Sequence, residues 1–168
     1  AAGLDIHEGV AQVAALLSHP AHPLFDRAAR MAIAPGSVFK TISAVALLEA
    51  AAVDPEEPTL CRGYLDHPER LRCAVYRRHG VGHGAVTLPD ALAQSCNVYF
   101  FHHAGQLGPE KLIEWAALFG VGQPSGVDLP GEAAGLVPTP ATIRHLEGPA
   151  WRTAAPQLLA LGQGSLQT

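Results

Sequence analysis

Prolines and glycines interrupt this sequence at short intervals and limit it to short elements of secondary structure. The 168 residues include 14 prolines and 17 glycines. Pro35-Gly36 and Gly108-Pro109 each break a helical run, because proline lacks a backbone donor and glycine tolerates non-helical conformations. No apolar run approaches the ~20 residues that span a bilayer. With 48% hydrophobic and 15% charged residues, the chain is still apolar enough to build a core.

The hydrophobic pattern predicts strands near the start of the chain and several short helices after them. Two apolar stretches flank His7-Glu8-Gly9, where glycine suits the tight turn of a strand pair. Thr87 and Asp90 have the spacing of a capping box, and Gly120 follows the last apolar residue of a helical run. The segment 59–86 shows no regular pattern, so we expect it to be irregular. The expected strands cover 1–6 and 10–18, a short amphipathic stretch covers 25–34, and the expected helices cover 37–52, 87–94, 97–107, 109–119 and a short stretch from Pro140.

Lysine and asparagine are almost missing, so the positions at which they occur stand out. The chain has two lysines, Lys40 and Lys111, and one asparagine, Asn97, beside nine arginines. Lys40 follows Ser37 by three positions, which on a helix places the amine one turn from the hydroxyl. A serine hydroxyl becomes a good nucleophile only with a base in contact with it. The spacing therefore predicts a nucleophilic Ser37 with Lys40 as its base; the alternative is a capping serine beside an exposed lysine.

A second motif, Ser95-Cys96-Asn97, lies at the break between two expected helices. A second serine can pass protons between the lysine, the nucleophile and a leaving group. The Asn97 amide can hold a substrate amide through its carbonyl and its NH₂ group. The alternative interpretation is an ordinary helix cap, because Ser and Asn both prefer that position.

Together, the two motifs resemble the acyl-transfer set of penicillin-recognising enzymes. The resemblance to class B penicillin-binding proteins extends over nearly the whole chain as an ordered series of segments. In order, these are Ala34-Pro-Gly-Ser-Val-Phe-Lys-Thr-Ile, Gly82-His-Gly-Ala-Val-Thr-Leu, Ser95-Cys-Asn-Val-Tyr-Phe-Phe, Phe119-Gly-Val-Gly, Ser125-Gly-Val-Asp-Leu-Pro-Gly-Glu, Gly135-Leu-Val-Pro-Thr and Leu161-Gly-Gln-Gly.

The resemblance implies an α/β (α+β) fold with a helical lobe and an antiparallel sheet. The family closes its active site with a Lys-Thr/Ser-Gly strand, and the last lysine here is Lys111. We therefore expect residues 1–168 to be a partial transpeptidase domain with a nearly complete helical lobe and an incomplete sheet. We also expect this piece to lack the Lys-Thr-Gly strand, the pedestal domain and the membrane anchor of the family.

The activity implied by the resemblance is crosslinking of peptidoglycan stem peptides, with β-lactams acylating Ser37 by the same route. It needs no cofactor. The implied partners of the full protein are a membrane anchor and a glycosyltransferase, and the implied location is the periplasmic face of the cell membrane. The net charge of −4 argues against a nucleic-acid partner, since phosphate contacts need clustered Lys and Arg. The alternatives are a serine β-lactamase, a β-lactam sensor domain or a catalytically inert scaffold.

Three cysteines and several histidines form a further candidate site. Cys61, Cys73 and Cys96 lie within 36 positions, and Cys96 lies inside the second motif. With His83 they make a suitable set of ligands for a tetrahedral structural zinc ion. The glycines around His83 suit a close approach to a metal, although His67 and His79 are alternative ligands. The competing interpretations are a Cys61–Cys73 disulfide with Cys96 buried and free, and three plain thiols.

Overall fold

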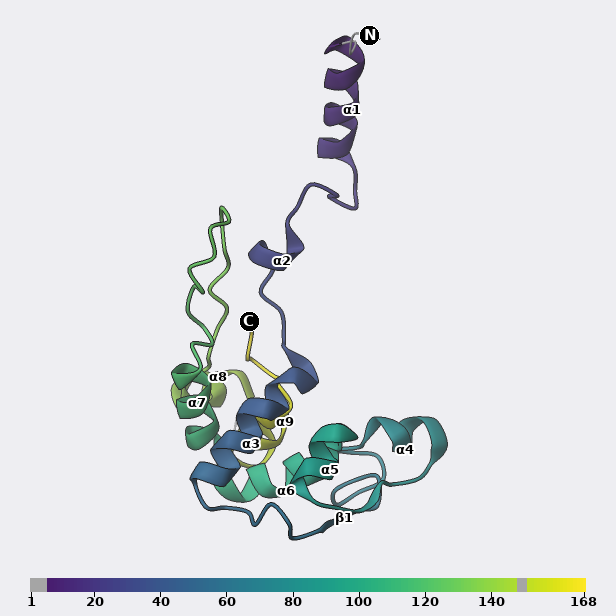
Figure 1. Ribbon diagram of the computed structural model, residues 1–168, viewed down its shortest axis with the longest axis vertical. Coiled ribbons are helices and arrows are strands. Elements are labelled where there is room, and N and C mark those ends of the chain that lie inside the picture. Colours follow the sequence, from purple (N-terminus) through teal and green to yellow (C-terminus); the bar gives the residue numbers. More distant parts are fainter. Residues whose placement is uncertain (1–5, 148–150) are drawn as a thin grey trace. The chain divides into compact units, whose positions relative to one another are not determined.

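The computed structural model describes residues 6–147 and 151–168, and it divides the chain into two compact units. One unit comprises residues 1–31 with 126–133, and the other comprises 32–125 with 134–168. Figure 1 labels the α-helices and strand β1 (Thr59–Cys61) of these units. Over the described ranges, none of the helices combines the length and the apolar character needed to cross a membrane.

The first unit contains the helices α1 (Ile6–Ser18) and α2 (Arg27–Arg30). The strand prediction for residues 10–18 is wrong, because the alanines and leucines of this stretch favour a helix more strongly than Gly9 favours a turn. The other predicted strand, 1–6, lies outside the described residues except for its last position. Helix α2 lies within the amphipathic stretch 25–34, and the Asp26 carboxylate caps it by accepting hydrogen bonds from two backbone nitrogens of its first turn.

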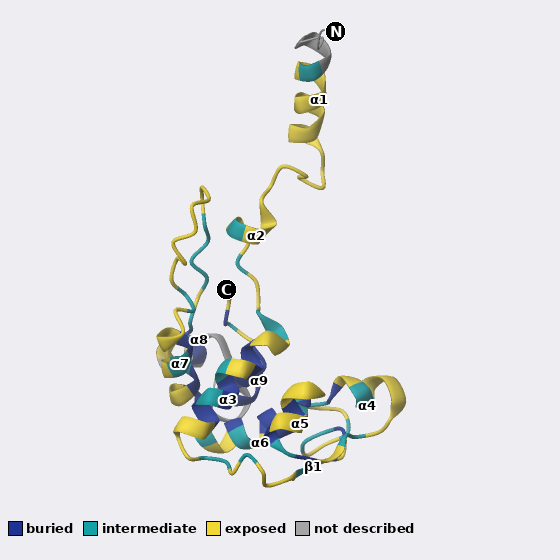
Figure 2. Ribbon diagram, in the orientation of Figure 1, coloured by how far each residue is buried: buried dark blue, intermediate teal, exposed yellow. Residues whose placement is uncertain are grey.

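The second unit is built around a central helix, α6, whose aromatic side chains Tyr99, Phe100 and Phe101 are buried. Helix α6 packs against α9, and α3 packs against both α6 and α7. Figure 2 shows buried residues on these helices. The helices of this unit are η1 (Gly36–Phe39, a 3₁₀ turn), α3 (Lys40–Glu49), α4 (Ala74–His79), α5 (Leu88–Ala93), α6 (Asn97–Leu107), α7 (Pro109–Leu118), α8 (Pro140–Glu147) and α9 (Trp151–Ala160).

Most of the helices predicted for this unit are confirmed. Thr87 and Asp90 form the expected capping box at the start of α5, with each side chain accepting from the other's backbone nitrogen. The Thr139 hydroxyl accepts a hydrogen bond from the Thr142 backbone nitrogen at the start of α8. The sequence pattern missed α9, which contains Pro156, a residue that normally argues against a helix interior.

The segment 59–86 is more regular than predicted. Strand β1 (Thr59–Cys61) pairs antiparallel with β2 (Gly84–Val86), with Cys61 opposite Gly84, and α4 lies between the strands in the sequence. Helices with a small antiparallel sheet make an α+β unit, as predicted.

The end of the chain pairs with the segment that precedes η1. Ile33 and Thr168 exchange two backbone hydrogen bonds of 2.9 Å, and the Gly36 backbone nitrogen donates to the Gly162 carbonyl at 2.9 Å. Deeper in the core, the Ser43 hydroxyl donates to the Ala160 carbonyl at 2.9 Å. Residues 160–168 therefore lie directly against the start of the helix that carries Lys40.

Candidate active site

Ser37 lies on the 3₁₀ turn that leads directly into α3. The turn begins after Pro35, and Gly36 has a φ of +62°, a conformation that glycine adopts without strain. Ser37 is exposed, whereas Phe39 and Lys40 are 2% and 1% exposed. The turn thus presents a serine hydroxyl to solvent and directs the lysine that follows it into the protein.

The buried Lys40 ammonium joins the two sequence motifs. Its Nζ donates to the Ser95 backbone carbonyl at 2.8 Å, to Ser95 Oγ at 2.9 Å and to Asn97 Oδ1 at 2.7 Å. The same Nζ lies 5.7 Å from the centre of the Phe100 ring, within the range of a cation–π contact. Three donated bonds account for all three hydrogens of an ammonium group.

Burial lowers the pKa of Lys40 from 10.5 to about 8, although the nearby Cys96 and Cys73 sulfurs act in the opposite direction. Taking a cation out of water disfavours its charged form. An amine with a pKa of about 8 is neutral in roughly a tenth of the molecules at pH 7, far more than at the ordinary value of 10.5, and the neutral form is the one that a general base requires.

Ser95 and Asn97 owe their placement to the short connection between α5 and α6. Ser95 has a φ of +52°, which is strained for a residue with a side chain. The Cys96 backbone nitrogen donates to the Ala91 carbonyl at 2.8 Å and fixes the connection against α5. Asn97 is the first residue of α6, and its Nδ2 donates to the Arg72 backbone carbonyl at 3.0 Å. Both ends of the Asn97 amide are therefore held.

The structure brings three of the four predicted catalytic residues into one hydrogen-bonded group. Lys40, Ser95 and Asn97 are joined directly, and Ser37 lies on the turn that precedes Lys40. Within the described residues, no hydrogen bond joins the Ser37 hydroxyl to the Lys40 amine. The sequence did not predict the contact with the Arg72 carbonyl, because every residue has a backbone carbonyl and the residue type therefore does not indicate which one accepts a hydrogen bond.

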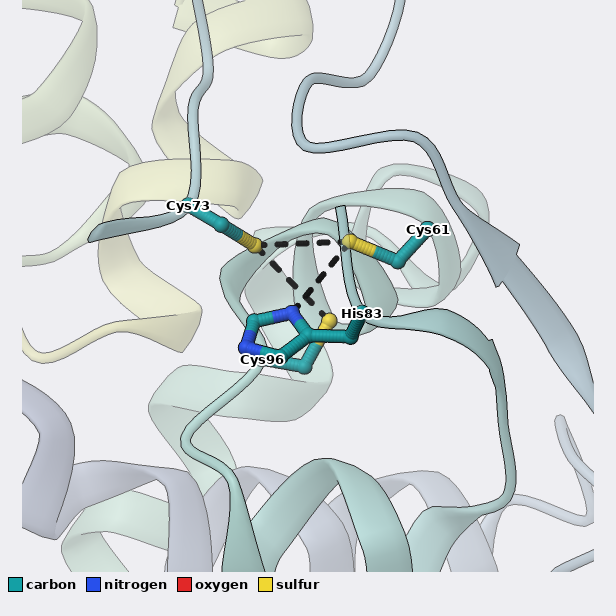
Figure 3. Close-up of side chains that lie close together, drawn as sticks. All are labelled: Cys61, Cys73, His83 and Cys96. Carbon is teal, nitrogen blue, oxygen red and sulfur yellow. Dashed lines mark hydrogen bonds between the residues drawn. The ribbon is translucent and has the colours of Figure 1, made fainter. Parts of the chain in front are cut away.

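The predicted cysteine and histidine cluster is also present, and Figure 3 shows its four side chains converging. The Cys73 sulfur lies 3.6 Å from that of Cys61 and 3.8 Å from that of Cys96, and Cys61 Sγ lies 3.4 Å from His83 Nδ1. All four ligand atoms lie within 4.8 Å of one another. The three cysteines are buried and free, and His83 is half-buried.

Local backbone geometry explains why these side chains meet. Pairing of β1 with β2 brings the segment next to His83 alongside Cys61. A Cβ at Gly82 would collide with the Cys61 carbonyl oxygen and with the Gly63 backbone nitrogen, so only glycine allows this approach. The Cys73 backbone nitrogen donates to the Gly63 carbonyl at 2.8 Å and places the second cysteine on the same side. Gly82 thus allows a close approach of the backbone next to His83 to the backbone of residues 61–63.

The alternative histidines lie outside the cluster. His67 and His79 are exposed, and the His67 ring accepts a hydrogen bond from the backbone nitrogen of Glu69 instead. The sulfurs of Cys61 and Cys73 are farther apart than the about 2.05 Å of a disulfide bond. Of the three candidate histidines, His83 is the one that lies beside the cysteines.

The three thiols differ in acidity. The hydrogen bond between Cys96 and Cys73 is the main factor that lowers the pKa of Cys73 to about 5. The hydrogen bond from the Val98 backbone N–H also lowers it. The hydrogen bond with Cys73, together with burial, raises the pKa of Cys96. Burial raises the pKa of Cys61. Of the three sulfurs, Cys73 therefore carries negative charge most readily, and a thiolate is the form that binds metals.

The cysteine cluster is in direct contact with the hydrogen-bonded group of Lys40, Ser95 and Asn97. Cys73 Sγ accepts hydrogen bonds from the backbone nitrogens of Asn97 at 3.2 Å and Val98 at 3.4 Å. The preceding residue, Arg72, supplies the carbonyl that holds the Asn97 side chain. Cys96 lies between Ser95 and Asn97 in the chain. The position of the cysteine sulfurs and the position of the Asn97 amide are thus linked by short contacts.

Comparison with known proteins supports the resemblance seen in the motifs. The family described as penicillin binding protein transpeptidase domain matches residues 8–167. Peptidoglycan D,D-transpeptidase MrdA of Acinetobacter baumannii is 32% identical over 144 residues, which cover 85% of this chain and 21% of that protein. Stage V sporulation protein D of Bacillus subtilis is 37% identical over 105 residues, which cover 61% of this chain and 16% of that protein.

Solved structures show the same fold. Pseudomonas aeruginosa PBP2 in complex with WCK 5153 has a TM-score of 0.81 and 31% identity, covering 94% of this chain and 36% of the other. Helicobacter pylori PBP2 also has a TM-score of 0.81, with 27% identity over 94% of this chain and 30% of that one. The chain spans about a fifth of the length of the MrdA proteins that it matches. With its motifs in order and a match over residues 8–167, the chain belongs to the penicillin-binding protein transpeptidase domain family.

Proposed function

We propose that the protein carrying this chain is a serine D,D-transpeptidase that crosslinks peptidoglycan stem peptides through an acyl-enzyme on Ser37. The observation that carries the proposal is the Lys40 amine bonded to both Ser95 Oγ and Asn97 Oδ1. Relatives named peptidoglycan D,D-transpeptidase share this part of the chain. A β-lactam enters the same reaction, because its strained amide reacts with the same nucleophile.

In the proposed acylation, the Ser37 oxygen attacks the carbonyl carbon between the two terminal D-alanines. Its proton passes to the neutral Lys40 amine, whose lowered pKa makes that form available. The C–N bond then breaks, and the departing D-alanine nitrogen takes a proton delivered through the Ser95 hydroxyl. Asn97 holds the amide of the donor peptide with the N–H that its Arg72 bond leaves free.

In the proposed second half, an amine from another stem peptide attacks the acyl carbon. That amine loses a proton to Lys40 through Ser95, the C–O bond to Ser37 breaks, and the serine oxygen recovers a proton. The products are a new peptide bond and the original enzyme, so atoms and protons balance over the cycle.

The first experiment labels the full-length protein with a fluorescent penicillin and locates the adduct by peptide mass spectrometry. We expect one adduct on Ser37, its loss in S37A, and unchanged labelling in S18A, a matched change of an exposed serine in α1. Undiminished labelling of S37A would overturn the assignment. An acyl-enzyme that persists for many minutes supports a transpeptidase, whereas rapid turnover of penicillin would identify a β-lactamase.

We further propose that Cys61, Cys73, His83 and Cys96 hold one structural zinc ion. Zinc–thiolate bonds of about 2.3 Å in a tetrahedron place neighbouring sulfurs about 3.8 Å apart. The observed sulfur separations of 3.6 Å and 3.8 Å fit that arrangement. Four protein ligands leave no open position for water, so the ion would stabilise the fold and take no part in the chemistry.

Elemental analysis of full-length protein purified without added metal tests this site. We expect about one zinc per chain, a strong loss in H83A, and no loss in H79A, which changes an exposed histidine four positions earlier. A chelator should lower the melting temperature, because structural zinc is coupled to folding. Zinc far below one per chain, with Cys61 and Cys73 oxidised and the mass two daltons lower, would establish the disulfide instead.

We infer that the complete protein acts at the periplasmic face of the cell membrane, held by an anchor and working beside a glycosyltransferase. A complex of Helicobacter pylori PBP2 with MreC and a complex that coordinates polymerization and crosslinking are among the structures similar to this chain. Labelling of intact cells with a β-lactam that does not cross the cytoplasmic membrane tests the location. Labelling only after lysis would contradict it.

A further inference from the structure

The turn after α9 lies directly against the turn that carries Ser37. Gly162 has a φ of +63°, its backbone nitrogen donates to the Leu159 carbonyl at 2.8 Å, and its own carbonyl accepts from the Gly36 backbone nitrogen at 2.9 Å. Gly36 immediately precedes Ser37. A single backbone hydrogen bond thus connects the residue next to the nucleophile with a residue more than a hundred positions later.

The two turns are too close for any side chain at position 162. A Cβ there would lie 2.5 Å from the Gly36 carbonyl oxygen, 2.7 Å from Phe39 Cβ and 2.9 Å from the Gly36 backbone nitrogen. Real Cβ atoms essentially never come within 3.0 Å of another group. Two of the three atoms belong to the backbone of Gly36, so no rotamer change relieves the collision. A larger residue at 162 must therefore push its own turn and the start of η1 apart.

That displacement would act on Ser37 more than on Lys40. Lys40 is buried and its side chain is fixed by Ser95 and Asn97, and the Ser43 hydroxyl fixes the next turn of α3 to the Ala160 carbonyl. The Ser37 side chain is exposed, and in the described part of the chain its hydroxyl has no hydrogen-bond partner. The placement of the nucleophile therefore depends on the backbone of its turn.

We propose that Gly162 is a positioning residue that sets the place of the Ser37 hydroxyl relative to Lys40 through its backbone contact with Gly36. This inference rests on the proposed function, because it assigns Gly162 a role in the acylation of Ser37. In this proposal Gly162 acts through the backbone of the turn and not by contact with substrate. Gly162 affects the position of Ser37 in two ways. It has no side chain that would push Gly36 away, and its carbonyl accepts the hydrogen bond from the Gly36 backbone nitrogen.

The test compares G162A with G122A in the full-length protein. Gly122 is a matched control, because it has a φ of +83° and its added Cβ would lie 3.0 Å from Val137 Cγ2 and from the Val137 backbone nitrogen, away from η1. For each variant, the acylation rate constant at saturating penicillin and the concentration for half-maximal rate are measured separately. We expect G162A to lower the rate constant about ten- to a hundredfold, as a misplaced nucleophile does, with the half-saturating concentration within twofold. In G122A, both the rate constant and the half-saturating concentration should stay within twofold of the wild-type values.

The pH dependence of the acylation rate constant distinguishes a positioning role from a loss of stability, because lower stability alone does not change its midpoint. The midpoint of the acylation profile should be the same in G162A and the wild type, since the bonds of Lys40 are not touched. A shifted midpoint would mean that the change acts on the lysine and would overturn the proposal, as would a rate constant equal to that of G122A.

If G162A yields no folded protein, G36A takes its place. Gly36 has a φ of +62° with open space around it, so alanine there strains the same turn without a collision. The same loss in rate constant is expected, and a wild-type value would overturn the proposal. A wild-type protein that is never labelled at Ser37 would refute the proposed function itself.

Discussion

The Cys73 sulfur accepts a hydrogen bond from the backbone nitrogen of Asn97 at 3.2 Å. It accepts a second from Val98 at 3.4 Å, and these two nitrogens are the first N–H groups of α6. Such groups have no partner inside their own helix, and the N-cap residue Cys96 supplies no side-chain bond. A cysteine 24 positions earlier therefore caps the helix that begins with Asn97.

Replacement of Cys73 should separate the capping role from the metal-binding role. The serine hydroxyl of C73S can still accept from α6 but is a poor zinc ligand, whereas C73A removes both functions. We expect C73A to be less stable than C73S by about 1 kcal/mol, the usual cost of a lost cap. Urea denaturation of both proteins in excess chelator isolates this difference. Equal stabilities would show that the sulfur does not act as a cap.

The rate of acylation by penicillin should follow the ionisation of Lys40. Only the neutral amine accepts the Ser37 proton, so the rate should rise with pH and level off above a midpoint of about 8. K40R should lose activity by about 10²–10⁴-fold over the whole range, because arginine stays protonated. Stopped-flow acylation between pH 6 and 10 measures both. A flat profile would exclude Lys40 as the base.

A negative charge introduced at position 97 should raise the midpoint of the pH profile of acylation. N97D places a carboxylate where the amide oxygen now lies 2.7 Å from Lys40 Nζ. A neighbouring negative charge favours the protonated amine, so the midpoint should shift above about 8 and the rate at pH 7 should fall. N97A is the uncharged control, and its midpoint should not rise. A midpoint for N97D at or below the wild-type value would contradict the arrangement.

His103 should make stability depend on pH in the acid range. Its Nε2 lies 2.8 Å from Thr59 Oγ1, and burial, with a smaller effect from His102, lowers its pKa from 6.5 to about 4. Between these values the unfolded chain binds more protons, so the free energy of unfolding should rise from pH 4 to pH 6.5.

H103Q should remove part of this dependence, about 1–2 kcal/mol between pH 4.5 and 6.5 after allowance for the partial exposure of the ring. H79Q, which changes an exposed histidine of α4, should leave the dependence unchanged. Urea denaturation at the two pH values measures both variants. The same dependence in H103Q and the wild type would mean that other groups cause it.

The sequence predicted those parts of the site that depend on local spacing. Ser37 and Lys40 lie on consecutive turns because helical periodicity places them there, and the Thr87 capping box fixes the start of α5. Residue type suggested the cysteine cluster, because three thiols and an imidazole make a tetrahedral zinc set, but it left a Cys61–Cys73 disulfide and three plain thiols open. The glycines beside His83 favoured it over His67 and His79 in the sequence, and the pairing of β1 with β2 gives the physical reason why it lies next to Cys61.

The parts that escaped prediction depend on backbone atoms or on tertiary packing. The Arg72 carbonyl and the Gly162 carbonyl contribute no side chain, so residue identity carries no signal for them. Helix α9 was missed because Pro156 argues against it locally, whereas packing against α6 favours it. Helix α1 was mistaken for a strand because alternation over a few residues resembles helical periodicity in an alanine-rich stretch.

The bond between Ser43 and the Ala160 carbonyl spans 117 positions in the sequence, and this separation has a consequence for how the protein folds. Closing a flexible loop of that length costs about 4 kcal/mol of chain entropy. Contacts of this kind form only after the intervening helices have begun to pack, and they slow folding relative to local contacts. The turn around Ser37 should therefore be among the last parts of the unit to take its final shape, so that a partly folded chain has no competent nucleophile.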